Sequence, residues 1–125
     1  MKINKEEIPV IMEAPGTRMR SLGGYGGMAV AFNEIPAGTD LTPLLRGLPN
    51  NSCYCPHWGY IVEGELLVKY DNGEEEKLTA GEVFYLPEGH TGIVEKDLKM
   101  IEFSPEKEFK EVMAHIAEKI AQSVQ

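Results

Sequence analysis

Long apolar runs and basic residues are both scarce in this sequence. No stretch approaches the ~20 apolar residues that a transmembrane helix needs, so no membrane span is predicted. Residues 1–7 lack the apolar core and the cleavage site of a secretory signal, which favours a cytoplasmic protein. Lys and Arg number 12 against 20 Asp and Glu, for a net charge of −8. Because an acidic surface repels phosphate groups, we expect neither nucleic acid nor a membrane as a partner.

Cysteine is scarce too, since the 125 residues include only 2, Cys53 and Cys55. On an extended strand, side chains two positions apart stand about 6.6 Å from each other on one face, which disfavours a disulfide between them. Two free thiols or two metal ligands are therefore expected, and both fit a reducing compartment. The length of the chain suits one domain with one core.

Glycine and proline are plentiful by contrast, and they gather in three places. Residues 13–27 form a Gly-rich segment that resembles a mobile loop, able to lie over a pocket. Residues 36–52 contain too many Pro, Gly and Asn residues for regular structure. The pair Asn72-Gly73 favours a type I′ turn, because both residues tolerate positive φ, and predicts a hairpin between 65–70 and 74–79.

Short strands are predicted between these breakers, with one helix after them. Strands of this spacing without intervening helices are typical of an all-β antiparallel sandwich or barrel. Ser104 is a good N-cap, Pro105 suits the first helical position, and apolar residues then recur every three or four positions. The predicted strands are 28–35, 60–68, 74–79, 83–86, 90–95 and 98–103, and the predicted helix is 105–125.

The segment from Cys53 to Tyr60 carries the residue types that bind metals. If it is extended, Cys53, Cys55 and His57 point to one face. Cys55 and His57 then form the stereochemically easy pair, because Cys53 would lie about 13 Å from His57 unless the strand bulges near Pro56. Thiolate and imidazole are preferred zinc ligands. Equally, the cysteines fit as small buried residues and His57 as a hydrogen-bonded core histidine.

Two spaced patterns resemble those of the cupin superfamily, in particular its small uncharacterised single-domain proteins. Gly81, five residues and Pro87-Glu88-Gly89 match the second cupin motif, with His90 two positions before the usual histidine. Counting back from Gly64 places His57 in the glutamate slot of the first motif. The His-x-His slots fall on Asn51 and Cys53, or on Asn50 and Ser52, so the usual three-histidine, one-glutamate set is absent.

The resemblance implies a cupin-type antiparallel β-barrel, a double-stranded β-helix or jelly roll, with a C-terminal α-helix. It covers about residues 28–104, preceded by an N-terminal arm and Gly-rich loop at 1–27 and followed by the helix at 105–125, all in one domain. A divalent ion (zinc, iron, nickel or manganese) would be held by a Cys/His variant site. The residues expected at that site are Cys53, Cys55, His57 and His90, and those at the substrate pocket are Tyr85, Glu88 and Glu102.

Two classes of function follow from this interpretation. In the first, the bound metal acts on a small organic substrate, such as a small carboxylate or a sugar. In the second, the pocket belongs to a non-catalytic ligand-binding or sensor module without metal. Since a fold does not by itself define an activity, both remain open at this point.

A homodimer is expected as well. Trp58 and Tyr60 fall on the strand face opposite His57, which points outward in a barrel. Large aromatic side chains there need cover, and a second copy of the chain would supply it.

Overall fold

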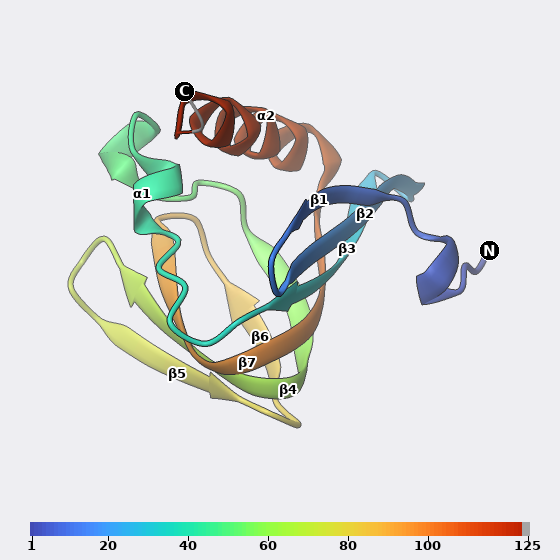
Figure 1. Ribbon diagram of the computed structural model, residues 1–125, viewed down its shortest axis with the longest axis horizontal. Helices are drawn as coiled ribbons and strands as arrows, with labels where there is room; N and C mark the ends of the chain where they lie inside the picture. Colours follow the sequence, from blue (N-terminus) through green and yellow to red (C-terminus); the bar gives the residue numbers. More distant parts are fainter. Residues whose placement is uncertain (124–125) are drawn as a thin grey trace.

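The computed structural model describes residues 1–123, and strands make up most of it (Figure 1). Its elements are η1 (Lys5–Glu7), β1 (Val10–Ala14), β2 (Thr17–Tyr25), β3 (Met28–Ile35), α1 (Thr42–Leu45), η2 (Pro49–Asn51), β4 (His57–Tyr70), β5 (Glu75–Thr79), β6 (Val83–Leu86), β7 (His90–Pro105) and α2 (Glu106–Ser123). Within these residues, no helix combines the length and the hydropathy needed to cross a bilayer.

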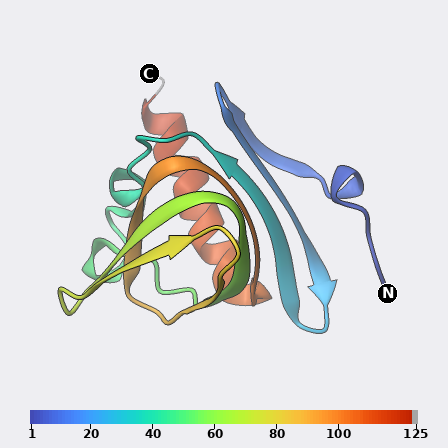
Figure 2. The same ribbon diagram turned by 90° about the horizontal axis from the view of Figure 1, so that it is seen from below.

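The strands form one antiparallel sheet whose order is β1-β2-β3-β7-β4-β5, with β6 paired to β4. Its curved part is built by β4 and β7, while β1 to β3 continue the sheet to one side (Figure 2). The first and last strands of this order do not pair, so the sheet is rolled but not closed as a barrel. The result is a cupin-like jelly roll with a helix packed on it.

Two long strands, β4 and β7, produce the curvature. Their pairing shifts register three times between Ile61 and Leu66, and such bulges bend a strand and increase its twist. Gly64 lies at this bend with a φ of 93°, and a Cβ there would collide with the carbonyl oxygen of Asp97. The sharp bend therefore depends on glycine at this position.

The predicted hairpin between β4 and β5 is present, but its turn differs from type I′. Gly73 has a φ of 90°, whereas Asn72 does not have positive φ. The backbone N–H of Tyr70 donates to the carbonyl of Glu74, and that of Gly73 donates to the carbonyl of Tyr70. The turn is thus a three-residue loop with one left-handed glycine, the next most common hairpin connection.

The Gly-rich segment 13–27 is not a mobile loop. Most of it forms β2, which pairs with β3 from Arg18↔Glu34 to Tyr25↔Met28. The buried Ser21 hydroxyl also donates to the carbonyl of Val30. Glycine disfavours a strand, but pairing with β3 supplies the backbone hydrogen bonds that hold β2 extended. Tertiary context therefore decides the structure here.

The helix α2 begins one residue later than predicted, because β7 continues through Pro105. The N–H of Glu106, the first residue of the helix, has no partner within the helix and donates instead to the carbonyl of Gly27. Ser104 stays in the strand, fully buried, and does not cap the helix. Positions 124 and 125 of the predicted helix lie outside the described residues. Apolar residues of α2 pack onto the inward face of β3 in a cluster that includes Ala29, Ala31, Leu45, Phe109 and Val112.

Candidate metal centre

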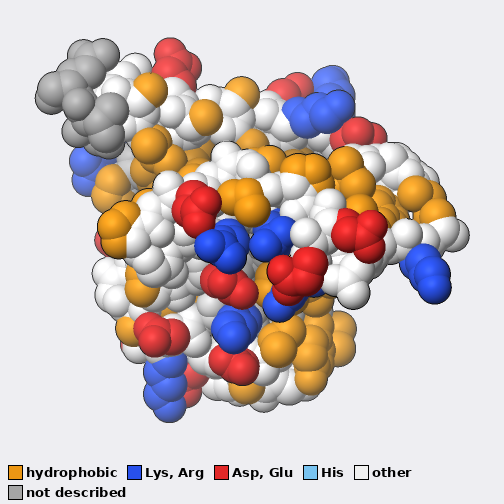
Figure 3. All heavy atoms as spheres, turned by 45° about the vertical axis from the view of Figure 1, so that its right-hand side comes forward, with side chains coloured by type: hydrophobic (Ala, Val, Ile, Leu, Met, Phe, Trp, Pro, Cys, Tyr) orange, Lys and Arg blue, Asp and Glu red, His pale blue; other side chains and the backbone are white. Residues whose placement is uncertain are grey.

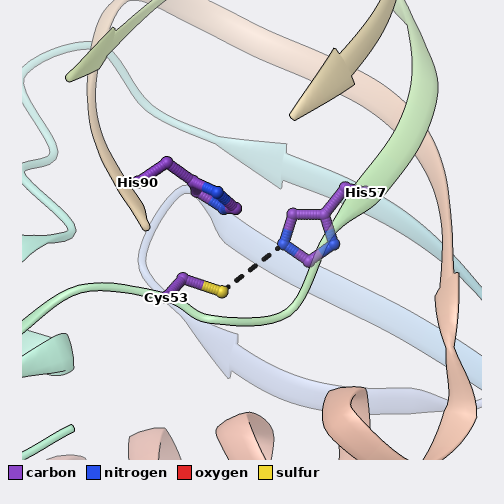
Figure 4. Close-up of side chains that lie close together, drawn as sticks. All are labelled: Cys53, His57 and His90. Carbon is purple, nitrogen blue, oxygen red and sulfur yellow. Dashed lines mark hydrogen bonds between the residues drawn. The ribbon is translucent and has the colours of Figure 1, made fainter. Parts of the chain in front are cut away.

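Three side chains of the types that bind metals converge inside the sheet. One donor atom each from Cys53, His57 and His90 lies within 4.8 Å of the other two (Figure 4). The Cys53 Sγ is 3.6 Å from His57 Nε2, and the centroids of the two imidazole rings are 5.0 Å apart. All three residues are buried. The arrangement offers one sulfur and two nitrogen atoms to a common point.

Backbone pairing holds Cys53 beside His90. The N–H of Cys53 donates to the carbonyl of His90 over 2.8 Å, and the N–H of Gly89 donates back to the carbonyl of Cys53. His57 opens β4 and His90 opens β7, while residues 53–56 do not form a regular strand. This break lets the chain turn, so that Cys53 approaches His57 instead of lying a full strand length away.

Each histidine has its second ring nitrogen engaged. His90 Nδ1 lies 2.7 Å from the carbonyl oxygen of Pro87, which only accepts, so Nδ1 carries the proton and Nε2 has the free lone pair. His57 Nδ1 is hydrogen-bonded to Ser104 Oγ at 2.6 Å, which directs Nε2 toward Cys53. Hydrogen bonds of this kind orient the rings of metal-binding histidines in proteins.

Burial determines the protonation of the cluster. It lowers the pKa of His57 to about 4, and burial together with the neighbouring His57 lowers the pKa of His90 to about 4. Burial also raises the pKa of the Cys53 thiol to about 12. At neutral pH the cluster therefore holds two neutral imidazoles and a thiol. A cation would need to displace one proton, that of Cys53.

Glu102 lies next to the cluster on the inward face of β7. Its Oε2 is 3.9 Å from His57 Nδ1, and its Oε1 accepts a hydrogen bond from Asn33 Nδ2 at 3.2 Å. Burial raises the pKa of Glu102 to about 7, against the opposing effects of His90 and Asn33. Because His57 is neutral at pH 7, the contact is not an ion pair. The carboxyl is placed to hold or release a proton near neutral pH.

A cavity of about 110 Å³ adjoins these groups. Its wall on the sheet side comes from β3, β4 and β7, and the opposite wall comes from α1 and α2. Met12 and Met19 of the first hairpin complete the lining, together with Cys53, His57, His90, Asn33 and Glu102. The candidate ligands thus face an internal space into which a small molecule fits.

The other predicted site residues lie elsewhere. Cys55 is fully buried, its Sγ contacts the carbonyl of Pro56, and it is hydrogen-bonded to Ser104, so it stands behind His57 and outside the cluster. The expected pair of Cys55 with His57 is therefore not the one that the structure forms. Tyr85 lies on the outer face of the sheet, stacked on Trp58 at 5.1 Å. Glu88 lines a separate shallow hollow at the β4–β5 turn.

Two residues of the site were missed from the sequence. Asn33 is predicted only as part of a strand, although a polar residue at an inward position of the apolar run 28–35 is a signal for a buried site. Ser104 is predicted as a helix cap, a role that its sequence position favours equally well. Nothing in the local sequence separates a capping serine from one that is hydrogen-bonded to a histidine.

Comparison with known proteins finds similarity in structure only. No protein-family model matches the sequence, and no curated protein matches it. An RmlC-like cupin from Shewanella frigidimarina is 20% identical, with a TM-score of 0.58 over 82% of this chain and 88% of that one. Ectoine synthase from P. lautus is 20% identical, with a TM-score of 0.61 over 84% and 77%. Fe(II)-HppE is 13% identical, with a TM-score of 0.58 over 83% and 59%. At these identities the likeness concerns the fold.

Proposed function

Starting from the cupin fold of this chain, we propose that it is a metal-binding protein that acts on a small organic molecule. Cys53, His57 and His90 would be the protein ligands of one divalent ion. The cavity beside them would receive the substrate.

The convergence of three donor atoms within 4.8 Å carries this proposal. One thiolate and two imidazoles form a set that suits zinc or iron better than manganese, which prefers oxygen ligands. Three protein ligands leave a coordination position for water or substrate, which is typical of catalytic sites. One structural neighbour, Fe(II)-HppE, is an iron-containing protein.

A bound ion would supply Lewis-acid polarisation of a substrate oxygen or activation of a coordinated molecule. The chain's own groups supply the rest. The carbonyl of Pro87 holds His90 in the tautomer with a free Nε2. Glu102, with a pKa raised to about 7, would take or give a proton beside the substrate. The buried wall of the cavity would keep bulk water away.

Ligand binding without metal is the alternative function, and the protonation of the cluster favours it. Two neutral imidazoles and a thiol are stable together in a buried site, because none of them is charged at pH 7. The cavity would then bind a small molecule without converting it.

Elemental analysis of protein purified without a chelator or a polyhistidine tag separates the two functions. We expect about one equivalent of zinc or iron per chain. Each of the variants Cys53→Ala, His57→Ala and His90→Ala should lose most of it. Cys55→Ala and His115→Ala are the matched controls and should keep it, since neither residue belongs to the cluster. A wild-type protein that stays metal-free after incubation with each ion in reductant would refute the metal site.

We further propose a cytoplasmic homodimer. Both cysteines are free, which fits a reducing compartment. The outer face of the sheet carries an aromatic patch composed of Trp58, Tyr60, Val83, Tyr85 and Phe103. Hydrophobic side chains gather on the surface beside an area of mixed basic and acidic side chains (Figure 3). Aromatic residues are enriched in interfaces between proteins, and the patch lies opposite the cavity, so pairing would leave the site open.

A further inference from the structure

We propose that the cavity takes a neutral, mostly apolar molecule about the size of phenol, with one O–H or N–H group that donates to Asn33 Oδ1. This inference rests on the proposed function only in using the same cavity as the ligand site. It does not depend on a bound metal.

The lining of the cavity excludes most charged ligands. Among the described residues that line it, apolar side chains predominate, and none is Lys or Arg. Glu102 is the only acidic residue among them. In the metal-free cavity a carboxylate or phosphate would thus be buried without a counter-ion and next to Glu102, which is strongly unfavourable.

A sugar fits poorly for a related reason. Its several hydroxyl groups would need partners, but much of the polar lining is already paired. Thr91 Oγ1 is hydrogen-bonded to Thr42 Oγ1 at 2.9 Å, and His90 Nδ1 is hydrogen-bonded to Pro87. Each buried hydroxyl left without a partner costs roughly 1–3 kcal/mol of binding free energy. The site therefore suits a ligand with few polar groups.

Asn33 supplies a fully buried acceptor that lacks a donor. Its side chain is 2% exposed, its Nδ2 donates to Glu102, and no described group donates to its Oδ1. A buried acceptor of this kind is rare in a folded protein, and it is commonly explained by a missing ligand or water. Oδ1 is itself fully buried, but Asn33 lines the cavity, so a small shift of its side chain would bring this oxygen to a bound molecule with an O–H or N–H group.

The size of the cavity sets the size of the ligand. At about 110 Å³ it is somewhat smaller than an engineered cavity of about 150 Å³ that binds benzene. Met12, Met19 and Met113 line it and are only partly buried. Their unbranched side chains can shift to admit a molecule of about seven heavy atoms, such as phenol.

The test compares phenol, anisole and benzoate by isothermal titration calorimetry on the full chain. Phenol offers a donor, anisole has the same ring without one, and benzoate adds a negative charge. We expect phenol to bind about tenfold more tightly than anisole, and benzoate to show no binding. The titrations use protein treated with a chelator, so a failure of the metal proposal leaves this result unchanged.

Asn33→Leu tests the residue itself. In this variant we expect phenol to lose its advantage while anisole binds as well as before. Equal affinities of phenol and anisole for the wild type would overturn the proposal, since Asn33 Oδ1 would then be satisfied by water. Tight binding of benzoate would overturn it as well. If the variant does not fold, as judged by its thermal melting, the wild-type comparison alone decides.

Discussion

Protonation distinguishes Cys53 from its two neighbours in the cluster. Its thiol pKa is raised to about 12, whereas the imidazole pKa values are lowered to about 4. At pH 7.5 to 8.5 the histidines are already in the form that binds a metal, and Cys53 is not. Glu102, with a pKa of about 7, is mostly ionised throughout this range. Binding of a divalent ion should therefore release one proton, from Cys53.

The affinity for zinc should accordingly rise about tenfold per pH unit between pH 7.5 and 8.5, because one proton leaves for each ion bound. Competition with a chelator of known pH dependence measures this slope. In Cys53→Ala the affinity should fall and the slope should disappear, since the two imidazoles carry no proton to release. An unchanged slope in that variant would mean that the released proton comes from another group.

Residue by residue, the sequence names every member of the cluster but favours Cys55 over Cys53 as the partner of His57. The preference for Cys55 assumed a regular strand from 53 to 57, in which alternation decides which side chains meet. Residues 53–56 form no regular strand, and Cys53 is instead held by an isolated β-bridge to His90, a residue far away in the sequence. Metal binding by these residues stays a prediction.

At the scale of the elements, β4 has a bend that depends on a single residue. Gly64 combines a φ of 93° with close approach to the backbone of Asp97. Gly64→Ala should lower the free energy of unfolding by more than about 2 kcal/mol, since left-handed strain and a backbone collision add. Urea denaturation measures the loss.

Gly73→Ala is the control for this prediction. Its φ is 90°, yet nothing lies within 4 Å of the position of its Cβ. It should therefore lose only about 1–2 kcal/mol, the cost of a left-handed residue with a side chain. Equal losses in the two variants would show that the contact with Asp97 does not stabilise the bend.

The strands and helix from 28 to 123 were largely predictable because their signals are local: β-branched runs, the Asn-Gly pair and an amphipathic stripe. The pairing of β1 and β2 was not predictable for the opposite reason. Glycines at 23 and 24 suggested a loop, and only the neighbouring β3 makes a strand there favourable. The open edge of the sheet likewise depends on which strands pair, and the local amino-acid composition does not indicate strand pairing.

At the scale of the whole molecule, the aromatic patch predicts association. Tyr85 is 53% exposed and stacks on Trp58, which lies between Tyr85 and Phe103, so a charge at position 85 would fall within the patch and against its central residue. We expect the wild type to sediment as a dimer and Tyr85→Glu as a monomer, measured by sedimentation velocity at equal concentration. Asn72→Asp adds the same charge at the β4–β5 turn and should remain dimeric. A wild-type protein that sediments as a monomer would contradict the dimer.

The central position of β7 also bears on how the chain is made. β3 pairs with β7 along its whole length, from Met28↔Pro105 to Ile35↔Leu98, and β7 lies between β3 and β4. On the ribosome, the sheet therefore cannot close over the cavity until residue 105 has emerged. Until then the nascent chain exposes the inward face of β3 and an unpaired strand edge, both of which promote aggregation. Long-range pairing of this kind places folding among the slow two-state reactions, in milliseconds to seconds.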